Sequence, residues 1–132
     1  MNRVVARFQD GRLLKGTTND FFPNRSHFHI LPEEQPSENK PVEVRVADLK
    51  ALFFVKTFGG NPQRMGLRVP EQTPKGAGRR IRVVFTDGEV LLGTTQGYDR
   101  SRPGFFVIPF EPDSNNERCF VVAAATQEVS LL

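Results

Sequence analysis

The sequence predicts an all-β chain made of two small, strongly bent antiparallel barrels that are related by internal duplication. Three observations predict this class: the chain matches itself at a shift of 77 residues, each copy opens with alternating apolar residues, and an Asp-Gly pair follows each opening run. With residues 3–55 laid over 80–132, sixteen of 53 positions are identical without a gap, whereas roughly three or four would be expected at typical residue usage. We therefore expect a first barrel repeat over 1–55, a Gly/Pro-rich basic linker over 56–79 and a second barrel repeat over 80–132.

The opening strand of each repeat alternates apolar and polar residues, as a half-buried strand does. Asp10-Gly11 and Asp87-Gly88 then predict a tight hairpin, because such a turn needs a positive φ that glycine tolerates. A second strand follows in each repeat, and it contains Gly16 or Gly93. A glycine inside a strand often marks a sharp bend, which a small closed barrel requires.

The remaining strands of each repeat are short apolar runs separated by turn residues. We expect a third strand over 28–31 and 105–108, a fourth over 42–46 and 119–122, and a last one over 52–55 and 129–132. Five bent antiparallel strands of this length suit an SH3-like or Sm-like small barrel.

Composition restricts the environment of the chain. Twelve Phe, one Tyr and no Trp suggest Phe-filled cores or Phe-rich interfaces. The single cysteine, Cys119, excludes an internal disulfide and favours a reducing compartment. No run is long enough to span a membrane and the start lacks a signal peptide, so we expect a cytoplasmic protein without membrane insertion. The net charge of +3 comes mainly from the linker, which argues against a strongly basic nucleic-acid surface on the folded units.

One short motif resembles the first signature of Sm-like proteins, including the bacterial Hfq type. It reads apolar-x-apolar-x-x-Asp-Gly-x-x-Leu-x-Gly in both repeats, and in the second it continues into Gln96-Gly97-Tyr98-Asp99. The resemblance implies an Sm-like barrel and an RNA ligand. In Sm-like proteins a second signature ends in a basic-Gly pair that lines the RNA pocket, but 44–55 and 121–132 contain no glycine.

The whole chain also resembles an uncharacterised bacterial family of unknown function. The resemblance is carried by Arg80 to Glu89, Gly93 to Tyr98, Arg102 to Phe106 and Ser114 to Arg118. Domains of this kind are found alone or beside PilZ-type cyclic-dinucleotide receptors, which implies a place in bacterial signalling. The PilZ binding motif itself has no match in this chain.

The loops between the second and third strands hold the candidate ligand- or partner-binding residues, which are Asn24, Arg25, Tyr98, Arg100 and Arg102. Arginine offers forked donors to a phosphate or carboxylate and can stack on a base. The alternative interpretation is that the arginines secure their own turns by bonding a nearby glutamate.

No convergent catalytic or metal-binding set is visible, so we expect neither an enzyme nor a cofactor. Cys119 lies in an expected strand as an inert thiol, and His27 and His29 share a strand face without a third ligand. The sequence thus favours a non-enzymatic binding or adaptor module whose partner is another protein or a second copy of the chain. The alternatives are an Sm-like RNA-binding protein and, third, a sensor of a small ligand such as a nucleotide.

Overall fold

The computed structural model describes residues 2–33, 40–55, 78–99, 101–109 and 116–132. These residues form ten strands and two short 3₁₀ turns, and they contain no α-helix. The first half of the chain holds β1 (Asn2–Phe8), β2 (Leu13–Thr18), β3 (His27–Pro32), β4 (Val42–Arg45), η1 (Val46–Asp48) and β5 (Leu49–Val55). The second half holds β6 (Arg79–Phe85), β7 (Val90–Thr95), β8 (Gly104–Pro109), β9 (Asn116–Val122), η2 (Ala123–Ala125) and β10 (Thr126–Leu131). The predicted all-β class is therefore confirmed.

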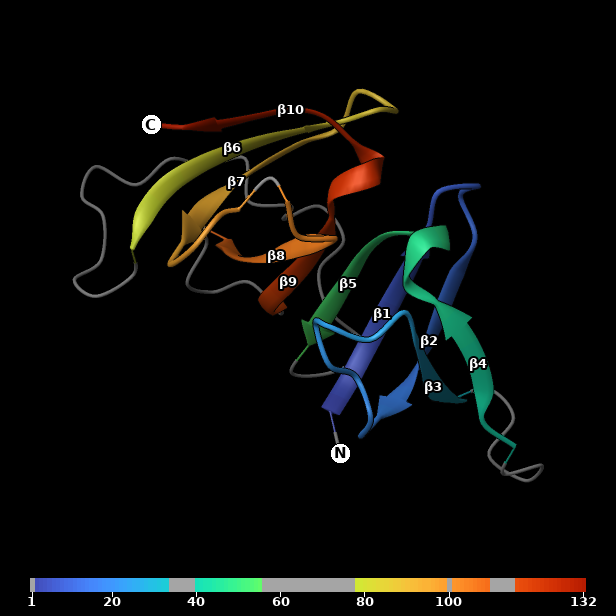
Figure 1. Ribbon diagram of the computed structural model, residues 1–132. Coiled ribbons are helices and arrows are strands. Elements are labelled where there is room, and N and C mark those ends of the chain that lie inside the picture. The colour runs from blue at the N-terminus through green and yellow to red at the C-terminus, as the bar shows by residue number, and fades with distance from the viewer. Residues whose placement is uncertain (1, 34–39, 56–77, 100, 110–115) are drawn as a thin grey trace.

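All ten strands are hydrogen-bonded into one open antiparallel sheet with the order β10-β6-β7-β8-β9-β5-β1-β2-β3-β4. Each half contributes five neighbouring strands, and the halves meet where β5 pairs with β9 (Figure 1). Phe53 lies opposite Cys119 in that ladder, and Leu52 lies opposite Phe120. This ladder makes the sheet continuous from one half to the other. Two separate barrels are therefore not confirmed, and that part of the expectation stays a prediction.

Glycines set the local geometry at two kinds of position. Gly11 and Gly88 have φ values of 94° and 92°, so each Asp-Gly pair forms the expected hairpin turn. Gly16 and Gly93 serve close approach instead, since a Cβ on either would collide with a backbone carbonyl oxygen of β3 or β8. At both glycines two backbones therefore come too near for a side chain, while the expected bend in the second strand stays a prediction.

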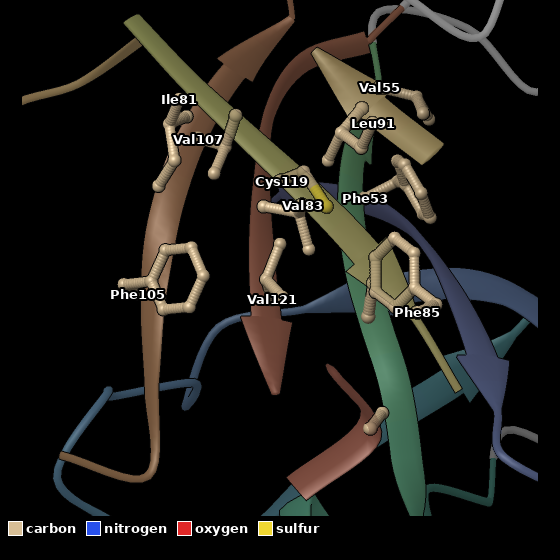
Figure 2. Close-up of a cluster of buried hydrophobic side chains, with 12 residues drawn as sticks. Phe53, Val55, Ile81, Val83, Phe85, Leu91, Phe105, Val107, Cys119 and Val121 are labelled. Atoms are coloured by element: carbon tan, nitrogen blue, oxygen red, sulfur yellow. The ribbon is translucent and has the colours of Figure 1, made fainter. Parts of the chain in front are cut away.

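Two buried clusters form the core, and each draws side chains from both halves. The first cluster consists mainly of second-half residues, but it also contains Ala51, Phe53 and Val55 from β5 (Figure 2). The second cluster consists mainly of first-half residues, but it also contains Phe120 and Val122 from β9. Neighbouring residues of a strand point to opposite faces, so β5 and β9 each fill both clusters.

The adjacent phenylalanine pairs of the sequence are divided in this way between the clusters. Phe53 lies in the first cluster and Phe54 in the second. Phe105 is buried in the first, while Phe106 is partly buried against the second. All seven residues of β5 are buried as a consequence. The halves are therefore joined by a strand ladder and by shared cores.

The linker expected over 56–79 lies outside the described residues except for its last two positions. Where the structure does describe the chain, it shows no helix of the length and apolar character that crossing a membrane requires.

Candidate binding groove

A groove lies between two loops, one from each half of the chain. Its walls are the loop that leads from β2 to β3 and the loop that leads from β7 to β8. The larger recess has a volume of about 970 Å³. It is lined by Pro23, Asn24, Thr94, Thr95, Gln96, Gly97, Tyr98, Asp99, Arg102, Pro103, Gly104, Phe105, Phe106, Ile108, Arg118 and Phe120. We call this recess, together with the smaller one that adjoins it, the inter-half groove.

The smaller recess has a volume of about 490 Å³. Asn24 and Pro103 line both recesses, so the two adjoin each other at the boundary between the halves. The other residues of the smaller recess are Arg25, Ser26, His27, Arg45, Val46, Ala47, Val122, Ala123 and Ala124. A ligand that followed the groove would therefore contact both halves at once.

Apolar side chains from β8 and β9 line the larger recess. Phe105 and Phe120 are buried, Phe106 is half-buried, and the side chain of Ile108 is 43% exposed. These residues offer an apolar contact surface beside the open space of the groove. An apolar side chain of a partner could bury its surface there.

The rim of the groove is cationic. Arg102 and Arg118 line the larger recess, Arg25 and Arg45 line the smaller one, and all four are exposed. Asp99 is the single carboxylate among the described lining residues, and its Oδ2 lies 4.0 Å from Arg102 Nε. Four guanidinium groups against one carboxylate favour a ligand that carries negative charge.

Two of these arginines lie over aromatic rings. The Arg118 guanidinium carbon lies 4.5 Å from the ring centroid of Phe54 and 5.0 Å from that of Phe106. The Arg25 guanidinium carbon lies 4.8 Å from the ring centroid of Phe22. A nucleic-acid base could stack on these ring faces only by displacing an arginine.

The structure brings together four of the five predicted site residues. Asn24 and Arg25 form one wall of the groove, and Tyr98 and Arg102 form the opposite wall. Arg100 lies outside the described residues. The alternative in which glutamates tie down the loop arginines also involves residues outside the described part, while Arg25 instead contacts Phe22 and Arg102 approaches Asp99.

Sequence reasoning missed Arg45, Arg118 and Phe106 as groove residues. Arg45 ends β4 and Arg118 lies within β9, so neither belongs to a loop. They reach the groove because β9 and β4 flank it once β9 has paired with β5. A signal was present in the alternation of β9, because Arg118 shares a face with Phe120 and Val122.

An ion-pair cluster holds the two halves in register beside the core. Arg7 on β1 donates to Glu89 with Nη1–Oε1 and Nη2–Oε2 distances of 2.9 and 3.3 Å. The Lys50 ammonium on β5 lies 2.7 Å from Asp87 and 3.3 Å from Glu89, and its side chain is only 7% exposed. The hydrogen bonds from Lys50 and from the Glu89 N–H lower the pKa of Asp87. The turn between β6 and β7 is thus anchored on the first half of the chain.

The comparisons with known proteins match the chain over its whole length. A family model described as "Family of unknown function (DUF6982)" covers residues 1–132. The chain belongs to this family. No curated protein and no solved structure matches it significantly. The resemblance to an uncharacterised family that the sequence suggested is thereby confirmed, while the association with PilZ domains stays a prediction.

Cys119, Asp20 and His29 have structural surroundings that account for their chemistry. Burial raises the pKa of the Cys119 thiol, which is completely buried. Burial alone would raise the pKa of Asp20, but hydrogen bonds from the His29 N–H and ring and from Thr18 outweigh it and lower that pKa. Within the described ranges no three His, Cys, Asp or Glu side chains gather as metal ligands would. His29 is thus tied to its own half of the chain through Asp20.

Proposed function

We propose that this chain is a non-enzymatic binding module that docks a protein partner in the inter-half groove. The observation that carries the proposal is that the groove has one wall from each half, and that the β5–β9 ladder joins these halves into one sheet. A site prepared in this way loses little conformational entropy on binding. A role as an adaptor in bacterial signalling, in the cytoplasm, fits the resemblance of the chain and is part of the proposal.

The partner surface that fits the groove is an acidic segment with an apolar side chain. Arg102 and Arg118 can each form paired hydrogen bonds with a carboxylate. Ile108 and Phe106 offer apolar surface close to these charges. Because arginines dominate the rim, a basic segment would meet repulsion there.

An Sm-like RNA-binding protein is the second candidate, and the cationic rim is the observation that favours it. Protein is the better fit because Arg25 and Arg118 already occupy ring faces of Phe22, Phe54 and Phe106. Single-stranded RNA is generally bound by stacking its bases on open aromatic rings.

The test is selection of peptides from a random display library on the purified chain, followed by binding assays with the enriched peptides. Arg102→Glu with Arg118→Glu reverses two charges of the rim, and we expect it to weaken binding at least tenfold. The matched control is Arg12→Glu with Lys15→Glu, two exposed cations that do not line the groove. This control should leave binding unchanged.

A fluorescent mixed-sequence RNA, titrated at low and high salt, separates the second candidate. Tight RNA binding that falls steeply with salt and is lost in the Arg102/Arg118 variant would support the RNA-binding alternative over the protein adaptor. Peptides that bind equally to wild type and to that variant would refute the groove as the docking site.

A further inference from the structure

The two halves of the chain meet in the ladder between β5 and β9, which we call the joint. Each strand of the joint has a counterpart at one free end of the sheet. At the shift of 77 residues that aligns the two halves, β10 corresponds to β5 and β4 corresponds to β9. β10 and β4 are also the first and last strands in the sheet order (Figure 1). A second copy of the chain could in principle extend the sheet there by repeating the joint, since an edge strand presents unpaired N–H and C=O groups.

The joint depends on apolar residues that each half inserts into the core of the other. From β5, Ala51, Phe53 and Val55 enter the first cluster, and each is at most 7% exposed. From β9, Phe120 and Val122 enter the second cluster, and each is at most 2% exposed. These five residues, which cross the joint into the core of the other half, are all apolar and buried.

The corresponding residues at the free ends are mostly polar. On β10, Glu128 takes the place of Ala51 and Ser130 takes the place of Phe53. On β4, Glu43 takes the place of Phe120 and Arg45 that of Val122. Only Leu132, the counterpart of Val55, is apolar, and its side chain is 62% exposed.

The backbone next to β4 carries a further obstacle. Pro41 directly precedes this strand and takes the place of Arg118, which lies opposite Phe54 in the joint. Proline lacks the N–H that a ladder uses, and it is typical of edge strands that do not pair.

We propose that these edge residues prevent β4 and β10 from pairing with a second copy in the way that β9 pairs with β5. The chain then remains a monomer and does not extend its sheet into a ring or fibre. In the register of the joint, Glu43 would be buried opposite Val129, and Glu128 opposite Val44. The nearest charged partner of Glu43 is His29, whose Nε2 lies 3.9 Å from Glu43 Oε2, too far for a hydrogen bond. Burying a carboxylate that is not fully hydrogen-bonded costs far more than an apolar contact of that size returns. Four side chains and Pro41 therefore decide whether the sheet pairs with a second copy or ends at its own two edges.

Light scattering across the micromolar range tests the first consequence. The wild-type chain should have the mass of one 14.9 kDa molecule at every concentration. A discrete dimer or larger ring of wild type would overturn the proposal.

A gain-of-function experiment tests which residues are responsible. One variant carries Pro41→Arg, Glu43→Phe and Arg45→Val, and a second carries Glu128→Ala and Ser130→Phe, so that each edge receives the residues of the joint. Mixed together, they should form a complex of one copy of each, and the mass should double. A control with Arg12→Phe and Lys15→Val adds apolar surface away from both edges, and it should stay monomeric when mixed with the second variant.

Circular dichroism establishes that the variants remain folded. If either is unfolded, the milder pair Glu43→Leu and Ser130→Val replaces them. Folded edge variants that stay monomeric on mixing would show that these side chains do not restrict pairing, and the proposal would be wrong.

Discussion

Replacing Phe53 by alanine should destabilise both halves of the chain together. Phe53 belongs by sequence to the first half, but its ring is 4% exposed and lies among second-half residues such as Leu91 and Phe85. Removing a buried phenylalanine ring costs about 3–5 kcal/mol, because the transfer free energy is lost and a cavity remains. A chain of this size has a total stability of about 5–15 kcal/mol, so the change would remove a large part of it.

Urea denaturation measures this prediction with two probes. Circular dichroism follows all the strands, and the fluorescence of Tyr98 follows the second half alone. With a urea dependence of about 2 kcal/mol per molar, the midpoint should fall by about 2 M in both signals. The control is Phe22→Ala, a residue that is 47% exposed, for which we expect a loss of less than about 1 kcal/mol.

Two outcomes would contradict the reasoning. If the dichroism and fluorescence midpoints separated, the halves would unfold independently and the shared cores would not couple them. If Phe53→Ala cost no more than Phe22→Ala, the ring would not be buried in the second half at all.

Three further predictions concern charge and chemical access. Asp87→Asn should cost about 1–2 kcal/mol of unfolding free energy, because it removes a partner of the buried Lys50 ammonium. Asp10→Asn, at an equally exposed carboxylate paired with an exposed arginine, should cost clearly less. Equal losses for the two variants would contradict the assignment. Folding lowers the pKa values of Asp87 and Asp20. Their contribution to the free energy of unfolding is therefore complete above about pH 4, and it is lost as the pH falls through the pKa of the folded state. In an acid titration followed by circular dichroism, this loss of stability should be smaller when both residues are changed to Asn, and an unchanged profile would refute the prediction. Cys119 should react with a thiol reagent only after unfolding, and fast reaction of the native chain would show that the β5–β9 ladder opens.

Local sequence patterns predicted most of the secondary structure. The Asp-Gly hairpins formed as expected because turn geometry depends on two or three neighbouring residues. The third strand of each half lies within one residue of its expected bounds for the same reason, since alternation is a property of the strand itself. The fourth strand of the first half does so too, whereas that of the second half begins three residues earlier than expected, at Asn116.

The candidate site was predictable only in part. Asn24, Arg25, Tyr98 and Arg102 could be identified because loops with arginine are recognisable in the sequence. The alternation of β9 places Arg118 on one face with Phe120 and Val122, but it does not show that this face borders a groove, because that depends on the pairing of β9 with β5. Nothing in a single strand records which other strand it will pair with.

The sequence by itself determined the all-β class, the repeated order of strands and turns, and the absence of a disulfide. Each of these depends on residue type and on spacing over a few positions. Only the tertiary structure decided that β5 and β9 share their side chains between two clusters, that Lys50 is buried against Asp87, and that two loops from different halves face each other across a groove. The physical reason is that these contacts join residues far apart in the chain, where the free energy depends on which surfaces are buried together and not on local propensity.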